Sequence, residues 1–357
     1  PDLVESAFQA FTEFNNLLNF KMKPSKAQPP KTSHKMQGVI IDIHSEYVQI
    51  RAEPRRRQRM ISCLEQILDA DQLKPDDAAT VAGKLYFLTT SIFGHAAKAA
   101  LRPIYARGQW APRNKQQAEA KLNHGLRTAI RVVLDIIREC RPVQIPLSPT
   151  TTCTPVVYAD AYFLMGDLHL KPTDEIPDTW DTKQAPHFAN GWGFVCRASP
   201  DLVLYACGAA SPRLLRRFCK RRAFIYFLEA WAQIIAAIAL RTYLKTDYVA
   251  FIDNEAAKHA LQKGYGKDAC INNLLAAFWT YTAKNNIQPY FERVSSNANI
   301  SDEISRGDLS RAHREGWQRV EFDYHLLEDI TEKIANNTEL AFNANLFEPL
   351  LKSGTPP

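Results

Sequence analysis

The sequence lacks several features that define whole classes of protein. Its seven cysteines are odd in number and none forms a Cys-x-x-Cys pair, which argues against a disulfide framework and against a zinc knuckle. A reducing, intracellular setting is therefore expected. The most apolar stretch, residues 230–244, is interrupted by Gln233 and Arg241 and is too short to span a bilayer. It predicts a buried helix, and we expect no membrane partner.

The first residues carry no secretion signal. Residue 1 is proline, and no charged segment followed by an apolar one comes after it. We expect the chain to be a fragment or a processed product. Its 357 residues suffice for two ordinary domains, and a content of 46% hydrophobic and 23% charged residues is typical of a soluble globular protein.

Positive charge is modest overall but locally concentrated. The formal net charge is +6, from 44 basic and 38 acidic residues. Residues 51–59 and 212–222 each gather basic side chains, as a surface that follows a nucleic-acid backbone would. A solvated helix face is the alternative interpretation. The candidate phosphate-binding residues are Arg55, Arg56, Arg57, Arg216, Arg217, Lys220, Arg221 and Arg222.

A change of composition divides the chain. Residues 1–140 carry apolar residues mainly at helical spacing, and within them the alternation at residues 35–52 predicts two short strands around a polar turn. Proline and threonine replace the helical pattern at residues 141–155. This segment predicts a linker between a mainly helical first module and a second module.

Beyond residue 155 the pattern predicts strands followed by alternating helices and strands. The expected strands are residues 155–163, 191–199, 202–210, 248–254 and 287–296. The expected helices are residues 227–244, 255–261, 269–284 and a short one that starts at residue 299 or 300. The first three strands follow one another closely enough to form an antiparallel meander. The order predicts an α/β fold in which helices flank a mixed five-stranded sheet.

Four carboxylates occupy distinctive positions in this pattern. Asp160 lies in the first strand and Asp253 at the end of the fourth, which we expect to be its neighbour in the sheet. Glu229 lies in a mainly apolar helix, where packing does not explain a lone acid. Asp302 lies in the last short helix. The alternative is that Asp253 caps the helix that starts at Glu255, and that Asp302 caps its own helix.

Acids this close together repel unless a cation neutralises them. Carboxylate oxygens are the ligands that Mg²⁺ prefers. A pair of divalent ions about 3.5–4 Å apart can activate water and stabilise the leaving oxygen in phosphodiester cleavage. The four acids therefore predict a site for two Mg²⁺ ions, in which Mn²⁺ would substitute.

The segments YADAY, FLEAW, FIDNEAA and VSSNANISDEISR, in this order and spacing, resemble the ribonuclease H domain of retroelement reverse transcriptases, most of all those of DIRS-like retrotransposons. The resemblance runs from about Val156 to Asp308, and it implies a ribonuclease H-like domain at residues 156–310 with a C-terminal extension at 311–357. DEDD exonucleases fit less well, because they place Asp-x-Glu on the first strand, whereas here Asp160 is followed by Ala161 and Tyr162. The last catalytic acid of DDE transposases is a glutamate, whereas the last of the four acids here is Asp302.

The first module resembles the end of a reverse-transcriptase palm, followed by the thumb and connection, at residues 19–42 and 83–107. The paired catalytic aspartates of that palm would lie upstream of this chain, so we expect no polymerase activity from it alone. Two departures concern the second module. Residues 164–190 extend the turn between its first two strands, and no histidine precedes Asp302, which predicts slow cleavage.

The resemblance implies Mg²⁺-dependent cutting of the RNA strand of an RNA–DNA hybrid. Asp160 and Asp253 would hold the metals, Glu229 would hold one and orient water, and Asp302 would complete the second site. The expected partners are an RNA–DNA hybrid or structured RNA, and an upstream polymerase segment or a ribonucleoprotein assembly. The compartment would be the nucleus or cytoplasm for a retroelement, or an organelle for a domesticated and processed protein.

A second hypothesis is a domesticated, non-catalytic RNA-binding component of a ribonucleoprotein. The four intact acids favour the enzyme, because relaxed selection would tend to lose one of them. The missing polymerase centre and the extended turn at residues 164–190 favour the structural component.

Overall fold

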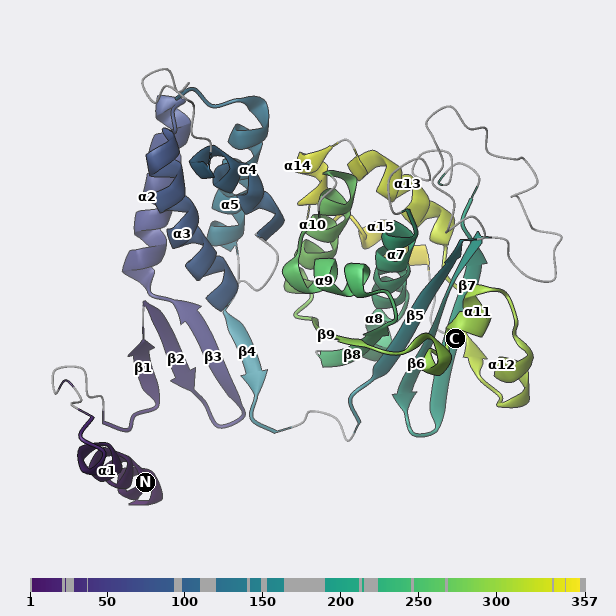
Figure 1. Cartoon of the computed structure of the whole chain (residues 1–357), viewed down its shortest axis with the longest axis horizontal. Helices are drawn as coiled ribbons and strands as arrows, with labels where there is room; N and C mark the ends of the chain where they lie inside the picture. The colour runs from purple at the N-terminus through teal and green to yellow at the C-terminus, as the bar shows by residue number, and fades with distance from the viewer. Residues whose placement is uncertain are drawn as a thin grey trace.

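The structure is a computed structural model of the chain, and Figure 1 shows an N-terminal part with a small sheet and helices beside a larger α/β part. It describes residues 2–20, 23, 29–36, 38–92, 98–109, 120–139, 142–148, 153–163, 190–211, 214, 224–244, 247–266, 269–335, 337–343 and 345–353. The described residues form an antiparallel four-stranded sheet and a mixed six-stranded sheet. The expected α/β class is confirmed.

The described residues of the N-terminal part form the small sheet, four long helices and a separate first helix. Its elements are α1 (Asp2–Leu17), β1 (Ser33–Met36), β2 (Val39–Ile43), β3 (Tyr47–Ala52), α2 (Pro54–Ala70), α3 (Pro75–Ile92), α4 (Lys98–Gln109), α5 (His124–Glu139) and β4 (Val143–Pro146). The mainly helical character predicted for the first module is confirmed. Strand order is β1-β2-β3-β4.

Helix α5 shows why these segments are helical. Leu126, Ile130, Val133 and Ile137 recur every three or four residues and are all buried, so they form one apolar face. That face packs in a core with residues of α2, α3 and α4, such as Leu64. Helical spacing of apolar residues therefore determines both the helix and the side that it buries.

The predicted linker differs from the structure at its start. Val143–Pro146 form strand β4, which pairs antiparallel with β3, with Val143 opposite Ile50 and Pro146 opposite Tyr47. A proline is tolerated here because β4 is an edge strand. The prediction of two strands ahead of the helices was also incomplete, because a third strand, β1, precedes them.

The larger sheet carries the candidate acids. Its strands are β5 (Val156–Phe163), β6 (Asn190–Ser199), β7 (Leu202–Ala209), β8 (Asp247–Ile252), β9 (Gln288–Arg293) and β10 (Gln318–Arg319), in the order β10-β7-β6-β5-β8-β9. The predicted meander of β5, β6 and β7 is confirmed, and β8 is the neighbour of β5, as expected, and runs parallel to it. The prediction of five strands is wrong by one. Strand β10 is only two residues long, too short to leave an alternating pattern.

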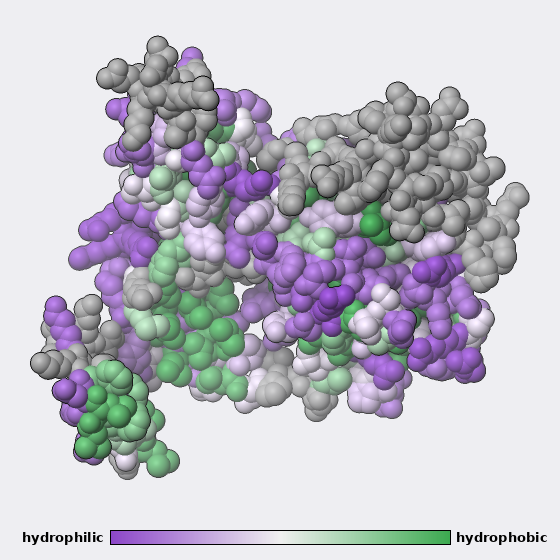
Figure 2. All heavy atoms as spheres, viewed as in Figure 1, coloured by the Kyte–Doolittle hydropathy of each residue, from purple (hydrophilic) through white to green (hydrophobic). Residues whose placement is uncertain are grey.

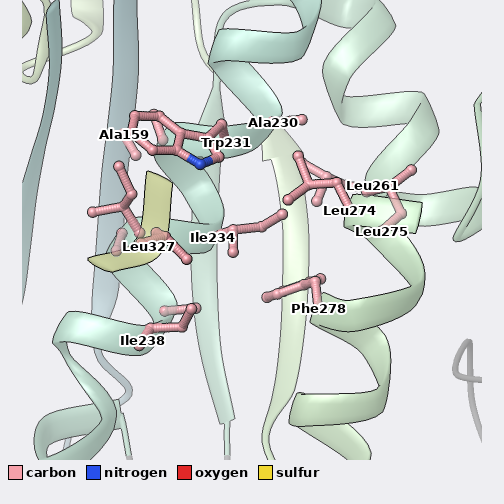
Figure 3. Packing of buried hydrophobic residues seen from close by; sticks show 14 of the residues in the cluster. Ala159, Ala230, Trp231, Ile234, Ile238, Leu261, Leu274, Leu275, Phe278 and Leu327 are labelled. Atoms are coloured by element: carbon pink, nitrogen blue, oxygen red, sulfur yellow. The ribbon is translucent and has the colours of Figure 1, made fainter. Parts of the chain in front are cut away.

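Helices cover this sheet and complete the part. They are α7 (Phe224–Ala239), α8 (Arg241–Leu244), α9 (Glu255–Lys263), α10 (Ala269–Lys284), the 3₁₀ turn η4 (Ser296–Ala298), α11 (Asp302–Ser305), α12 (Ser310–Arg314), α13 (Tyr324–Ala335), α14 (Thr338–Ala341) and α15 (Glu348–Ser353). Helix α7 is apolar almost all round because it is enclosed. Figure 3 shows Trp231 and Ile234 of α7 among side chains of β5, α10 and α13.

The described residues beyond 310 contribute side chains to this core. Leu327 of α13 is fully buried in it, and Trp231 Nε1 donates a 3.0 Å hydrogen bond to Thr331 Oγ1. Strand β10 adds to the sheet beside β7. The predicted C-terminal extension is therefore an integral part of the larger α/β unit, at least over the residues that the structure describes.

The two parts contact each other through helices. Helix α4 lies against α10, and Arg102 of α4 donates a hydrogen bond to the Gly266 carbonyl oxygen. The Arg102 guanidinium also lies 5.5 Å from the centre of the Tyr265 ring. Phe342 packs against the cores of both parts. These contacts hold the N-terminal helices beside the larger α/β part (Figure 1).

Hydrophobic side chains also gather on the surface of the N-terminal part, where Figure 2 shows them over α1 and the small sheet. Leu3 and Leu17 of α1 are exposed, as are Met36 of β1 and Ile145 of β4. Helices α2 to α5 therefore cover only part of that sheet. Among the described helices, none has the length and apolar character needed to cross a membrane.

Candidate metal centre

Three of the four predicted acids meet at the centre of the larger sheet. Asp160, Glu229 and Asp253 each offer a carboxylate oxygen, and these three oxygens lie within 4.8 Å of one another. The register explains the approach of the two aspartates. Tyr158 of β5 pairs with Phe251 of β8, and continuing this parallel register by two residues brings Asp160 beside Asp253. The expected proximity of these two acids is confirmed.

Glu229 reaches the same point from α7, which packs across β5. One helical turn further along, Gln233 is buried and its Nε2 donates to two backbone carbonyls. The acceptors are Ala159 O, at 3.1 Å, and Phe251 O, at 3.0 Å. These carbonyls belong to residues that closely precede the two aspartates. The two hydrogen bonds of Gln233 therefore fix the position of α7 relative to β5 and β8. They thereby set where Glu229 meets these aspartates.

Glu229 is only 4% exposed. Burial, followed by the nearby charges of Asp160 and Asp253, raises its pKa well above the usual range, while a hydrogen bond from the Ala161 amide acts in the opposite direction. Its Oε2 atom has no hydrogen-bond partner among the described residues. A buried carboxylate oxygen without a partner is costly, and a bound cation would satisfy it.

Asp160 is held by hydrogen bonds at both of its oxygens. Asn299 Nδ2 donates to Oδ1 at 3.1 Å, and Ser305 Oγ donates to Oδ2 at 2.6 Å. Burial raises the pKa of Asp160 to about 7, with Ser305 lowering it and the charge of Asp253 raising it further. Both donors are buried, so they fix the orientation of the Asp160 carboxylate.

Gly193 makes room for these donors. It lies opposite Asp160 in the neighbouring strand β6. A Cβ atom at Gly193 would lie 2.6 Å from the backbone nitrogen of Ser305 and 2.8 Å from the carbonyl carbon of Ile304. The absent side chain therefore allows α11 to lie directly on the sheet, where Ser305 can reach Asp160.

Asp302 is not one of the three converging acids. It is the first residue of α11, which begins later than the predicted residue 299 or 300, because residues 296–298 form a separate 3₁₀ turn. Its two oxygens accept hydrogen bonds from Arg306, with Nε at 3.1 Å from both and Nη2 at 2.9 Å from Oδ1. Three of the predicted acids therefore converge without Asp302, which is paired to an arginine beside them. The prediction that all four acids act in one site stays a prediction.

The capping alternative fails for Asp253. The residue that caps α9 is Asn254, whose Oδ1 accepts a 3.0 Å hydrogen bond from the Ala257 amide. Asp253 precedes this cap and directs a carboxylate oxygen to the other two acids. Its position at the end of β8 is therefore not explained by helix capping.

The first basic cluster, residues 51–59, contains arginines that bind within the protein and arginines that are exposed. Arg57 of α2 donates to the last carbonyls of α5, Ile137 O at 2.8 Å and Arg138 O at 2.5 Å, so it caps that helix. The Arg56 guanidinium lies 4.5 Å from the centre of the Phe87 ring. Arg55 is exposed, as is Arg59. The Nε and Nη2 atoms of Arg57 are thus engaged within the protein, and its contact with phosphate stays a prediction.

The second basic cluster is formed by residues 212–222. Arg216, Arg217, Lys220, Arg221 and Arg222 lie outside the described residues, as does most of the extended turn at residues 164–190. Their proposed contacts with nucleic acid stay predictions.

Sequence reasoning missed the residues that support the acids. Gln233 stood out only as a polar interruption of an apolar segment, although its spacing of four from Glu229 places both on one helix face. Asn299 and Ser305 lie in a polar stretch, and that pattern is typical of an exposed turn. Both are buried. The sequence does not indicate that a small polar residue is buried when its hydrogen-bond partner is distant in sequence.

The donor set suits a hard divalent cation. Three carboxylates, one of them with an unpartnered buried oxygen, converge in a largely buried location. The group can therefore hold a metal ion. Compared with known proteins, the chain matches no protein-family model and no curated protein.

Proposed function

We propose that this protein is a Mg²⁺-dependent nuclease of the ribonuclease H type, which cuts the RNA strand of RNA–DNA hybrids. The observation that carries the proposal is the convergence of Asp160, Glu229 and Asp253 within 4.8 Å, from β5, α7 and the end of β8. Neither packing nor capping accounts for three buried or half-buried acids at one point.

The sheet supports a ribonuclease H-like fold. The five longer strands lie in the order β7-β6-β5-β8-β9, with three antiparallel strands followed by two parallel crossovers. Two of the acids lie on the central pair, β5 and β8. This arrangement agrees with the resemblance carried by the segments around Asp160, Glu229, Asp253 and Asp302.

When bound, Mg²⁺ would activate a water molecule and stabilise the charge that develops on the leaving oxygen. Asp160 and Asp253 are the residues that would hold it, with Asp160 already oriented by Asn299 and Ser305. Glu229 Oε2, which has no other partner among the described residues, is the oxygen that would complete the ligand set or orient the attacking water. Mn²⁺ would substitute because it also prefers carboxylate ligands.

The basic surface supports a nucleic-acid substrate. Arg55 and Arg59 are exposed on α2, and we propose that their guanidinium groups contact phosphates. Phosphate contacts position a duplex without reading its sequence. We therefore expect recognition by the shape of the duplex.

The proposal is tested by incubating the full chain with an end-labelled RNA–DNA hybrid in Mg²⁺, in Mn²⁺ and in EDTA. We expect endonucleolytic products from the RNA strand with either metal and none in EDTA. Matched double-stranded RNA and double-stranded DNA serve as controls and should stay intact. Absence of products from the hybrid with both metals would contradict the proposal.

One observation favours the alternative of a non-catalytic RNA-binding component. The Asp302 carboxylate is neutralised by Arg306 and is not among the three converging acids. If the acids are relics, the same experiment should show hybrid or structured-RNA binding without cleavage.

A further inference from the structure

Arg306 occupies a defined position at the edge of the acid group. Its guanidinium carbon lies 4.2 Å from the centre of the Tyr162 ring. Tyr162 follows Asp160 by two residues in β5, so both side chains project from the same face of the sheet. Stacking on Tyr162 and hydrogen bonding to Asp302 together fix the plane of the guanidinium group next to the acids.

This arginine retains a free donor. Its Nε and Nη2 atoms bind Asp302, whereas Nη1 has no acceptor within the described part of the chain. The side chain is 45% exposed, so a ligand can reach it. A fixed guanidinium with one unused edge is suited to a phosphate oxygen.

Asp302 is poorly placed to serve as a free metal ligand. Both of its oxygens accept hydrogen bonds from Arg306. To bind a second ion as well, it would have to leave the arginine or bring a divalent cation close to a guanidinium. The three converging acids need no such rearrangement.

We infer that Arg306, oriented by Asp302 and Tyr162, binds a phosphate oxygen of the nucleic-acid strand at the acid group, and that a single metal ion is held there by Asp160, Glu229 and Asp253. Asp302 is thus a positioning residue and Arg306 is the group that touches the substrate. The inference rests on the proposed function, because it assigns the contacts of the same site. It differs from the two-ion expectation, in which Asp302 binds the second metal.

A neighbouring ion pair provides a matched control. Arg311 of α12 donates from Nε to Glu315 Oε1 at 3.0 Å, also with a spacing of four residues, and its guanidinium lies 5.5 Å from the centre of the Trp317 ring. This pair has the same chemistry as Asp302 and Arg306. Trp317 packs against the small core that also contains Ile304 of α11, so the two ion pairs lie on neighbouring helices over one local core.

The first measurement counts bound Mn²⁺ from the electron paramagnetic resonance of the free ion. We expect one tight ion per chain in the wild type, and the same number and an affinity within about threefold in Asp302→Asn and Arg306→Ala. The two-ion interpretation makes the opposite prediction, because removal of Arg306 would free Asp302 and strengthen a second site. A second ion that appears or tightens in Arg306→Ala would therefore overturn the inference.

The second measurement is hybrid binding in EDTA, by fluorescence anisotropy at several salt concentrations. Loss of one charge-assisted phosphate contact in Arg306→Ala should weaken binding about tenfold and lower the salt slope by about one. Arg306→Lys should recover the slope but not the full affinity, because lysine cannot keep the planar fork. Asp302→Asn should also weaken hybrid binding. The double variant that combines Asp302→Asn with Arg306→Ala should bind the hybrid as tightly as Arg306→Ala alone. Arg311→Ala should change neither quantity.

Equal effects of Arg306→Ala and Arg311→Ala on binding would overturn the inference. Neither measurement requires cleavage, so its failure is distinguishable from failure of the proposed function. A wild type that binds one ion and loses affinity on Arg306→Ala, yet cuts no hybrid, would contradict the nuclease and retain the phosphate contact.

Discussion

Ser305 Oγ donates a 2.6 Å hydrogen bond to Asp160 Oδ2 across 145 residues of sequence. This contact joins the short helix α11 to the central strand β5. It fixes the orientation of the Asp160 carboxylate, which belongs to the metal centre. Hydrogen bonds of this kind set the direction and basicity of a ligand, and their loss typically weakens metal affinity by about 10–100-fold.

Ser305→Ala should therefore weaken Mn²⁺ binding by about tenfold while the chain stays folded. The pKa of Asp160 should rise further, because Ser305 is the group that lowers it. Competition between Mn²⁺ and a fluorescent chelator measures the affinity. Ser310→Ala, at an exposed serine in the nearby α12, is the control. Equal affinities for the two variants would show that Ser305 does not support the site.

Gly193→Ala should destabilise the protein, because the new Cβ would meet the backbone of α11. We expect a loss of about 1–3 kcal/mol in the free energy of unfolding, the usual cost of overpacking, together with weaker metal binding. Gly83→Ala is the control. Gly83 lies within α3 with nothing within 4 Å of its Cβ position, so alanine should be neutral or stabilising there. Denaturant unfolding would compare the two, and similar effects would argue against the close approach of α11.

The first basic cluster should separate into two kinds of arginine. Arg55→Ala with Arg59→Ala should reduce the salt slope of hybrid binding by up to about two, and leave stability nearly unchanged. Arg57→Ala should do the reverse, with a loss of about 1–3 kcal/mol in the free energy of unfolding, because the last carbonyls of α5 lose a charged donor. Anisotropy titrations and thermal melts measure the two effects. A slope that changes with Arg57 alone would contradict the assignment.

The pH dependence of the metal-free protein follows from Asp160. Its pKa is raised from 3.8 to about 7 in the folded state, so the folded state binds the proton more tightly than the unfolded chain. The resulting stabilisation is complete below the unfolded pKa and is lost as the pH rises through the folded pKa, between about pH 4 and pH 7. Glu229 acts in the same direction.

Thermal melts of the wild type and Asp160→Asn at several pH values in EDTA would test this. We expect the melting temperature of the wild type, relative to the variant, to fall as the pH rises toward 7. A constant difference would contradict the raised pKa. Metal affinity should rise over the same interval, because protons compete with the ion for the carboxylates.

Particular residues show what the sequence can predict here. Asp160 and Asp253 could be brought together because each lies on a short apolar strand, and the strand order makes those strands neighbours. Glu229 was recognisable as an acid without a packing role. The meander and the helices around the sheet followed from the spacing of apolar residues.

Other features left no such signal. Strand β10 is too short to show alternation. Strand β4 contains a proline, which is typical of the end of a strand or of a loop. The pairing of Arg306 with Asp302 and Tyr162 depends on how α11 lies on the sheet, which Gly193 decides by lacking a side chain. Contacts between polar residues far apart in sequence require the fold to be known first.

The most direct test of the metal centre is to compare the wild type with Asp253→Asn for both cleavage of a labelled hybrid and the change in melting temperature on adding Mg²⁺. Asp247→Asn, at an exposed acid at the start of the same strand, is the control. We predict that Asp253→Asn abolishes cleavage and the Mg²⁺-dependent rise in melting temperature but keeps hybrid binding, whereas Asp247→Asn behaves like the wild type. Wild-type cleavage and a wild-type Mg²⁺ response in Asp253→Asn would contradict the account.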